Sequence, residues 1–195
     1  MSSLETKLQL ENLPEFQKLA LETEDEVEED LPTFEHGLIC ANLSRELGNF
    51  LKGKNLGRVV DSTPEYRFLT RKSKKPGRYP DVSFVRQERL PTNFRTYPTI
   101  APDLAIEVVS PSDKEYEVEA KVKEYQQAGV MLVWVVYPFS QRIDVYRLQT
   151  GLIPQSIGAT GALSGESVIP GFTLAISEIF DYPPPPLESD ETDLE

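Results

Sequence analysis

The chain has 195 residues, of which 39% are hydrophobic and 27% charged, and its net charge is −12, values that predict one soluble globular domain. A single cysteine and a single histidine exclude an intrachain disulfide and any metal site built from nitrogen and sulfur alone, so a bound metal would be held mainly by oxygens, as Mg²⁺, Mn²⁺ and Ca²⁺ are. The longest apolar run, residues 130–137, is too short to span a bilayer, and we expect a cytoplasmic protein.

The acidic residues are concentrated at the two ends of the chain. Residues 1–35 hold 11 acidic and 2 basic side chains, and residues 181–195 hold 6 acidic and no basic ones. We interpret 1–32 as an acidic N-terminal segment and 181–195, which contains four consecutive prolines, as a disordered Pro-rich acidic tail. These ends either solubilise the chain or screen the domain between them, residues 33–180. Because the acidic residues are concentrated in the ends, the net charge of the whole chain does not argue against a nucleic-acid partner of the domain.

The first predicted element is a helix that starts after Thr33, a typical N-cap, and runs to about Lys52, where Gly53 ends it. Its apolar residues recur at helical spacing: Leu38, Ile39, Leu43, Leu47, Phe50 and Leu51.

Strand-like runs bounded by Pro, Gly or polar clusters follow, at residues 57–62 with 66–70 beyond a turn, at 81–86 and at 104–109. A second helix is predicted at 114–128, with Ser112 or Asp113 as its N-cap and Gly129 as its C-terminal cap.

The remaining elements are strands. Residues 131–136 have the β-branched, two-sided apolar character of a central buried strand, and 142–148 alternates with Ile143 and Val145 on its apolar side. One or two further strands are predicted within 152–174. A helix between two strands implies a crossover connection, and the element order predicts an α/β fold with a mixed sheet.

Two carboxylates stand at the ends of predicted strands. Asp81 follows a proline and opens one strand, and Glu107 lies in a second strand among apolar neighbours. An ionised glutamate that is buried on both faces of a sheet is costly unless it pairs with a cation or coordinates a metal. Glu107 is therefore either the partner of an arginine or lysine, or a metal ligand. Two carboxylates on adjacent strand ends can hold Mg²⁺ and leave room for water and a phosphate oxygen.

Basic residues crowd the region before Asp81. Residues 37–102 hold 13 basic and 5 acidic side chains. This basic stretch is the best candidate for contacts with nucleic-acid phosphates, and a solvated hairpin is the alternative. Its members are Arg67, Arg71, Lys72, Lys74, Lys75 and Arg78.

An ordered set of motifs spans the domain: Pro80-Asp81, Ile106-Glu107-Val108-Val109-Ser110-Pro111-Ser112, Lys121-x-x-x-Tyr125-x-x-x-Gly129-Val130, Val133-Trp134-Val135-Val136 and Ile169-Pro170-Gly171-Phe172. The set resembles the bacterial "putative restriction endonuclease" family, whose fold is similar to that of the PD-(D/E)XK nucleases. The resemblance covers about residues 34–180. It implies a restriction-endonuclease-like mixed β-sheet flanked by helices, and an endonuclease that cleaves DNA with Mg²⁺ or Mn²⁺ and a metal-activated water.

The same resemblance assigns the catalytic residues. Asp81 takes the position of the PD aspartate, and Glu107 takes the (D/E) position. The usual lysine would stand two residues after the glutamate, where this chain has Val109. The resemblance implies that Lys121, on the following helix, supplies the amine instead. In the alternative, Lys121 faces solvent beside Lys123.

Two residues at the start of the first helix are candidates for further members of the site. Glu35 corresponds to the helix glutamate that many such nucleases add to the metal shell, or it is a simple partner of the helix dipole. His36 either assists Glu35 at the site or, as is more common for a lone histidine near a helix start, is structural or exposed. We interpret Cys40 as buried and inert.

The displaced lysine leaves other functions open. The chain is either a nuclease, which we expect to be a homodimer that cuts two strands, or a catalytically inactive nucleic-acid-binding or regulatory module on the same fold. A third alternative is an oligomeric scaffold whose dimer is built by residues 130–136 and the C-terminal strands.

Overall fold

The computed structural model describes residues 32–68 and 77–183. The predicted acidic segment, up to residue 31, and the predicted tail from residue 184 onward lie outside these residues. Four cations of the basic stretch also lie outside them, namely Arg71, Lys72, Lys74 and Lys75.

A six-stranded mixed sheet with the strand order β1-β2-β3-β4-β5-β6 forms the centre of the domain. β3 and β4 pair in parallel, and the other neighbouring strands are antiparallel. The parallel pair is joined by the helix α4, which is the predicted crossover. The predicted α/β class is thus confirmed. The elements are β1 (Gly57–Asp61), β2 (Val82–Arg86), β3 (Leu104–Val108), α4 (Glu115–Gln127), β4 (Leu132–Tyr137), β5 (Arg142–Arg147) and β6 (Gln155–Ile157).

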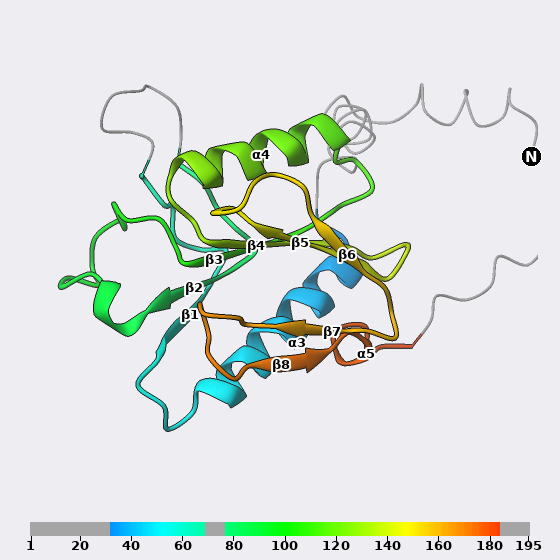
Figure 1. Cartoon of the computed structure of the whole chain (residues 1–195), viewed down its shortest axis with the longest axis horizontal. Coiled ribbons are helices and arrows are strands. Elements are labelled where there is room, and N and C mark those ends of the chain that lie inside the picture. The colour runs from blue at the N-terminus through cyan, green and yellow to red at the C-terminus, as the bar shows by residue number, and fades with distance from the viewer. Residues whose placement is uncertain (1–31, 69–76, 184–195) are drawn as a thin grey trace, which may run out of the picture.

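Helices cover both faces of this sheet (Figure 1). α4 lies on one face, and α3 (Phe34–Leu51) lies on the other. A small sheet of β7 (Ala162–Ser164) and β8 (Thr173–Ala175) packs on the α3 side together with the short helix α5 (Ile176–Ile179). A 3-10 turn, η2 (Gln87–Arg89), follows β2. Within the described ranges, no helix is both long and apolar enough to cross a membrane.

The sheet separates two apolar cores. Successive side chains of a strand point to opposite faces, so Leu104 and Ile106 of β3 join the core on the α3 side, and Ala105 joins the core under α4. Glu107 lies two residues after Ala105 in the same strand, so its side chain points to the same face and toward α4.

The sequence signals for α3 are confirmed. Thr33 is its N-cap, and the Thr33 Oγ1 accepts a hydrogen bond from the His36 backbone amide at 3.2 Å. Gly53 follows the C-cap with a φ of +74°, a conformation that glycine adopts without steric cost. The buried members of the predicted apolar stripe are Ile39, Leu43, Leu47 and Leu51.

Two local predictions are wrong, one for a strand and one for the N-cap of a helix. The predicted strand at 66–70 is reduced, in its described part, to a single bridge between Tyr66 and Arg78, because the Arg67 amide donates to the Pro98 carbonyl instead of to a neighbouring strand. The N-cap of α4 is Lys114, which makes no side-chain capping bond. Asp113 accepts a hydrogen bond from the Ser110 amide at 2.7 Å, so its carboxylate closes the preceding loop instead of capping the helix.

The part of the scaffold alternative that uses residues 130–136 is contradicted by the position of β4. This strand lies in the middle of the sheet, between β3 and β5. Residues 132–136 are buried within the chain, so they have no free surface for a dimer.

The C-terminal region contains three short strands, β6, β7 and β8, where one or two were predicted.

Candidate active site

The pairing of β2 with β3 brings the two predicted carboxylates together. Val82 pairs with Ile106 in an antiparallel register, and one further step of this register places Asp81 opposite Glu107. The Asp81 Oδ2 accepts a hydrogen bond from the Val108 amide at 2.7 Å. This bond fixes the aspartate against the end of β3.

Glu107 is held by two side chains of α4. It is only 5% exposed, and the rest of β3 is buried as well. The Lys121 Nζ donates to the Glu107 Oε2 at 2.9 Å, and the Tyr125 hydroxyl donates to Oε1 at 2.5 Å. Lys121 and Tyr125 are four residues apart, so they project from the same face of the helix. Each oxygen of the carboxylate therefore has its own donor.

The position of Lys121 decides between the two alternatives for this residue. Lys123, two residues later, is exposed and pairs with Glu119 at 3.1 Å. Lys121 instead turns toward the sheet and contacts Glu107, so the alternative in which it faces solvent is wrong. Its catalytic role stays a prediction.

Burial and charge together set the protonation of this cluster. Burial, reinforced by the charge of Asp81, raises the pKa of Glu107 above its usual value, against the opposing effects of Lys121 and Tyr125. Burial alone lowers the pKa of Lys121, but the carboxylates around it, Glu107 first, outweigh this effect and raise the pKa above its usual value. Lys121 is therefore a cation at neutral pH and compensates Glu107.

His36 belongs to this cluster, and the alternative in which it is exposed is wrong. It is buried in the first turn of α3, with its Nε2 3.3 Å from the Asp81 Oδ2 and its Nδ1 3.6 Å from the Cys40 Sγ. The hydrogen bond with Asp81, followed by that with Cys40, raises the pKa of His36 to about 10. Its spacing was the missed signal: His36 lies three residues before Ile39, on the buried stripe of the helix.

Glu35 points in a different direction from His36. Its side chain is half-buried, and its Oε1 accepts a hydrogen bond from the Tyr182 hydroxyl at 2.6 Å. Successive helical residues point about 100° apart, so α3 presents His36 to Asp81 and Glu35 to Tyr182. Tyr182 also packs on the core, which extends the folded domain beyond the predicted boundary at residue 180.

A cleft of about 860 Å³ lies next to this cluster. It is lined by Glu35 and Tyr182, by part of the loop 109–113 that follows β3, and by the turn 137–141 between β4 and β5. The Asp113 Oδ1 in this loop lies 3.9 Å from the Lys121 Nζ. The cleft therefore approaches Lys121 through Asp113, which lines it.

Of the basic stretch, the structure describes Arg67, whose guanidinium pairs with Glu65, and it also describes Arg78. The Arg78 guanidinium pairs with Glu124 of α4, and its backbone forms the bridge with Tyr66. The two ends of the basic stretch are therefore held next to each other, and Arg78 ties them to the helix that carries Lys121.

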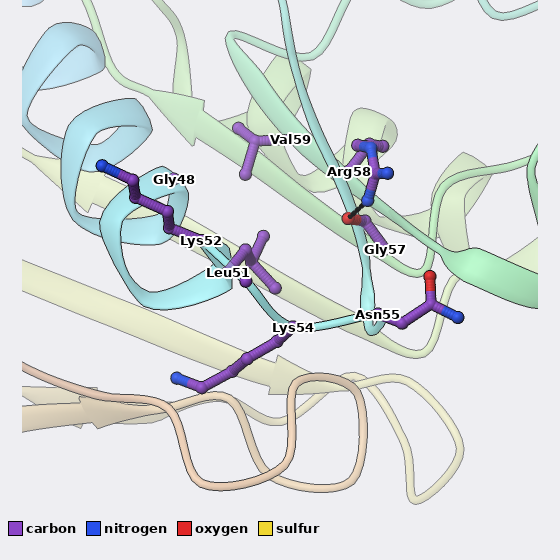
Figure 2. Close-up of a pocket in the computed structure, with 9 residues that line it drawn as sticks. Gly48, Leu51, Lys52, Lys54, Asn55, Gly57, Arg58 and Val59 are labelled. Carbon is purple, nitrogen blue, oxygen red and sulfur yellow. Dashed lines mark hydrogen bonds between the residues drawn. The ribbon is translucent and has the colours of Figure 1, made fainter.

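A second cavity, of about 630 Å³, lies at the turn between α3 and β1 (Figure 2). Its lining includes Lys52, Lys54 and Arg58 and, in the described part of the chain, no acidic residue. The Lys54 Nζ donates to the Phe50 carbonyl at 2.6 Å, and Arg58 donates to the Gly57 carbonyl at 2.8 Å. α3 has 18 residues, so this end lies about 27 Å from the His36 end, given a rise of about 1.5 Å per residue. The cavity is therefore separate from the carboxylate cluster.

Tyr125→Phe is expected to destabilise the domain. The change removes only the hydroxyl that donates to Glu107, at a position that is 0% exposed. A hydrogen bond to a charged group contributes about 1.5–3 kcal/mol, and we expect the free energy of unfolding to fall by that amount. Tyr116→Phe is the matched control, because Tyr116 lies on the same helix and is 64% exposed. Denaturant titration measures both, and equal effects would contradict the importance of this contact.

The motifs around Asp81 and Glu107 also match a known family. The model of the Uma2 family, described as putative restriction endonuclease, matches residues 4–177. The chain belongs to this family. The resemblance inferred from the motifs is thereby confirmed. No curated protein matches the chain significantly.

The fold of this Uma2 family member is also found in a solved structure. The chain is similar to the crystal structure of a putative nuclease belonging to DUF820 from Anabaena variabilis, with a TM-score of 0.64 and 20% sequence identity. The match covers 77% of this chain and 82% of the other. The predicted nuclease-like mixed sheet with flanking helices is confirmed.

Proposed function

We propose that this Uma2 family member is a metal-dependent endonuclease that hydrolyses phosphodiester bonds of DNA. The observation that carries the proposal is the buried Glu107 carboxylate, placed opposite Asp81 and contacted by the Lys121 amine. A buried carboxylate beside a second acid is costly, and such perturbed groups are typical of functional sites. The description of the family as putative restriction endonuclease supports the same choice.

The donor atoms fit a hard divalent cation. Asp81 and Glu107 would hold Mg²⁺ or Mn²⁺, because both ions prefer carboxylate oxygens. Burial raises the pKa of Glu107 and the charge of Asp81 raises it further, and a cation between the two carboxylates would relieve their repulsion. When bound, such an ion activates a water and stabilises the charge that develops on the phosphate.

The side chains of the chain would position the substrate and keep the carboxylates in place. Lys121 is a cation and stands between the buried Glu107 and Asp113 of the cleft, where its amine can bind the scissile phosphate or the attacking water. Tyr125 keeps Glu107 oriented. Glu35 is proposed as a third ligand, and this role requires that it leave its hydrogen bond with Tyr182.

Cleavage of plasmid DNA by the purified protein is the direct test. We expect nicked or linear product with Mg²⁺ or Mn²⁺, and no product after chelation. Asp81→Asn should abolish cleavage, because an amide no longer offers a charged oxygen to the cation. Asp61→Asn, at the exposed end of β1, is the matched control and should cleave normally. The absence of cleavage of any DNA substrate with either ion would overturn the proposal.

We also propose that the basic stretch contacts the phosphate backbone of DNA. The stretch directly precedes Asp81 in the sequence, and its base is closed by the bridge between Tyr66 and Arg78. Its charge fits phosphate, whereas the lining of the cleft includes Glu35 and Asp113.

A variant in which the four cations of residues 71–75 are replaced by alanine is expected to bind DNA more weakly and with a smaller salt dependence. Each lost phosphate contact lowers the slope of log K against log salt by about 0.9, so the slope should fall by up to roughly 3.6. Fluorescence anisotropy at several salt concentrations measures the slope. Lys123→Ala removes an exposed cation on α4 and is the control. If both variants kept the original slope, the stretch would not be the phosphate contact.

A binding or regulatory module without catalysis is the second candidate function. It is favoured by the hydrogen bonding of the carboxylates, because both oxygens of Glu107 and the Oδ2 of Asp81 already have protein partners. A gel shift without cleavage under any divalent ion would support it.

For the nuclease we propose a homodimer, since two sites are needed to cut two strands. Light scattering measures the oligomeric state.

A further inference from the structure

The single histidine and the single cysteine of the chain meet at Asp81. His36 and Cys40 are four residues apart on α3, so they project from the same face of this helix. One ligand atom from each of the two residues and one carboxylate oxygen of Asp81 all lie within 4.8 Å of one another. Across residues 32–68 and 77–183, this is the one group of three such side chains that comes so close.

This donor set selects a different class of ion from the carboxylate pair. Thiolate and imidazole ligands favour Zn²⁺ and related transition ions, whereas Mg²⁺ prefers oxygen. Zinc sites with three protein ligands keep the fourth position for water. We propose that His36, Cys40 and Asp81 form a binding site for a Zn²⁺-class ion, which shares only Asp81 with the proposed Mg²⁺ site at Asp81 and Glu107.

The three ligands need only a small rearrangement to converge. Ligand atoms around a tetrahedral zinc ion are roughly 3.3–3.8 Å apart, so separations that now reach 4.8 Å must close by up to roughly 1.5 Å. The imidazole now lies between its partners, with Nδ1 toward Cys40 and Nε2 toward Asp81. Only one ring nitrogen can bind the ion, so His36 and Cys40 converge by changing their side-chain rotamers. Cys40 is half-buried and the Asp81 side chain is 20% exposed, which leaves the ion a path from solvent.

The charges balance before and after binding. Without the ion, the group consists of a His36 imidazolium, a Cys40 thiol and an Asp81 carboxylate, with no net charge. Binding releases the imidazolium proton and the thiol proton to solvent, and the two positive charges of the ion replace them beside a thiolate and a carboxylate. The net charge of the group therefore stays at zero, so occupation of the site introduces no uncompensated charge into a half-buried region.

The shared Asp81 has a consequence for the proposed nuclease. An ion held by His36 and Cys40 takes a carboxylate oxygen away from the pair formed by Asp81 and Glu107. Binding itself does not depend on the proposed function, but its effect on cleavage does. If the chain is a nuclease, Zn²⁺ inhibits the cleavage that Mg²⁺ supports.

Titration with Co²⁺ as an optical probe tests the site directly. The full chain is expected to bind one Co²⁺ with a near-ultraviolet band from thiolate-to-metal charge transfer, and Zn²⁺ but not excess Mg²⁺ should remove this band. Cys40→Ser is expected to abolish the band and to lower the Zn²⁺ affinity by more than about 100-fold, since even outer partners of a metal site contribute about 10–100-fold. Circular dichroism checks that the variant is folded. The absence of a thiolate band in the unmodified chain would overturn the proposal, as would a Cys40→Ser variant with unchanged Zn²⁺ affinity.

A second measurement needs no variant. The reactivity of the Cys40 thiol toward a disulfide reagent should fall when Zn²⁺ is present and stay unchanged with Mg²⁺. Equal reactivity in both ions would contradict the site. Neither readout involves DNA, so a chain that binds Co²⁺ through Cys40 but does not cleave DNA would overturn the proposed nuclease alone. A chain that cleaves with Mg²⁺ but shows no thiolate band would overturn the zinc site alone.

Discussion

Glu107→Gln is expected to abolish metal-dependent cleavage in a protein that remains folded. Glutamine keeps the size of the side chain but removes the charge that would bind the cation. A metal ion contributes several kcal/mol to transition-state stabilisation, and about 4 kcal/mol corresponds to roughly a 10³-fold rate. We therefore expect the rate of plasmid cleavage with Mg²⁺ to fall by at least about 10³-fold.

The fold should tolerate this change because of what remains around position 107. The amide oxygen can still accept a hydrogen bond, so Tyr125 keeps a partner. Lys121 loses its counter-charge, but its side chain is 30% exposed and has Asp113 3.9 Å away. The charge left behind is thus partly solvated, and the free energy of unfolding should fall by less than about 3 kcal/mol, below the usual cost of orphaning a fully buried charge.

Glu119→Gln is the matched control for Glu107→Gln. Glu119 lies on α4 and is exposed, and it pairs with Lys123 at 3.1 Å. Exposed pairs of this kind contribute about 0.2–1 kcal/mol, so neither stability nor cleavage should change appreciably. If Glu107→Gln retained full metal-dependent cleavage, the assignment of the site would be wrong.

Lys121→Met should cost more stability than Glu107→Gln. It leaves the Glu107 carboxylate buried without a cation, and the loss of one partner from a buried pair costs about 3–5 kcal/mol. Methionine retains most of the aliphatic length of lysine, so the packing of α4 on the sheet is preserved. Cleavage is expected to fall by about 10²–10⁴-fold, the usual contribution of a group that positions or transfers a proton in the reaction.

The double variant Lys121→Met, Glu107→Gln separates the structural from the catalytic role. Both charges are gone, so most of the stability lost in Lys121→Met should return, whereas cleavage should stay absent. Thermal and denaturant unfolding measure the first effect, and plasmid cleavage measures the second. Lys123→Ala, two residues away and exposed, should change neither. If the double variant were no more stable than Lys121→Met, the ion pair would not explain the effect of Lys121.

Several elements could be predicted from local sequence because their signals are local. The ends of α3 follow from Thr33 and Gly53, which act within one turn of the helix. The predicted helix 114–128 differs by one residue at each end from α4. β3 and β4 are predicted by runs of mostly apolar residues, which are typical of strands that are covered on both faces.

The contacts of the site could not be predicted in the same way. Glu35 and His36 are adjacent in the first turn of α3, and only the rotation of this helix against the sheet decides which of them meets Asp81. The family resemblance favours Glu35, because many such nucleases add a helix glutamate to the metal shell. The position of Asp113 was equally open, since its carboxylate could cap α4 or close the loop, and it closes the loop.

The sequence by itself determined that Glu107 is buried among apolar residues and therefore needs a partner, because the cost of burying a charge depends on the immediate surroundings and not on the fold. The family resemblance had already assigned Lys121 to the site, but only the tertiary structure decided the contacts that each carboxylate makes. Lys121 and Tyr125 contact Glu107 although they lie 14 and 18 residues from it in the sequence, and His36 contacts Asp81 although it lies 45 residues away. Such contacts depend on how α3 and α4 pack on opposite faces of the sheet, and no periodicity within a single segment records that packing.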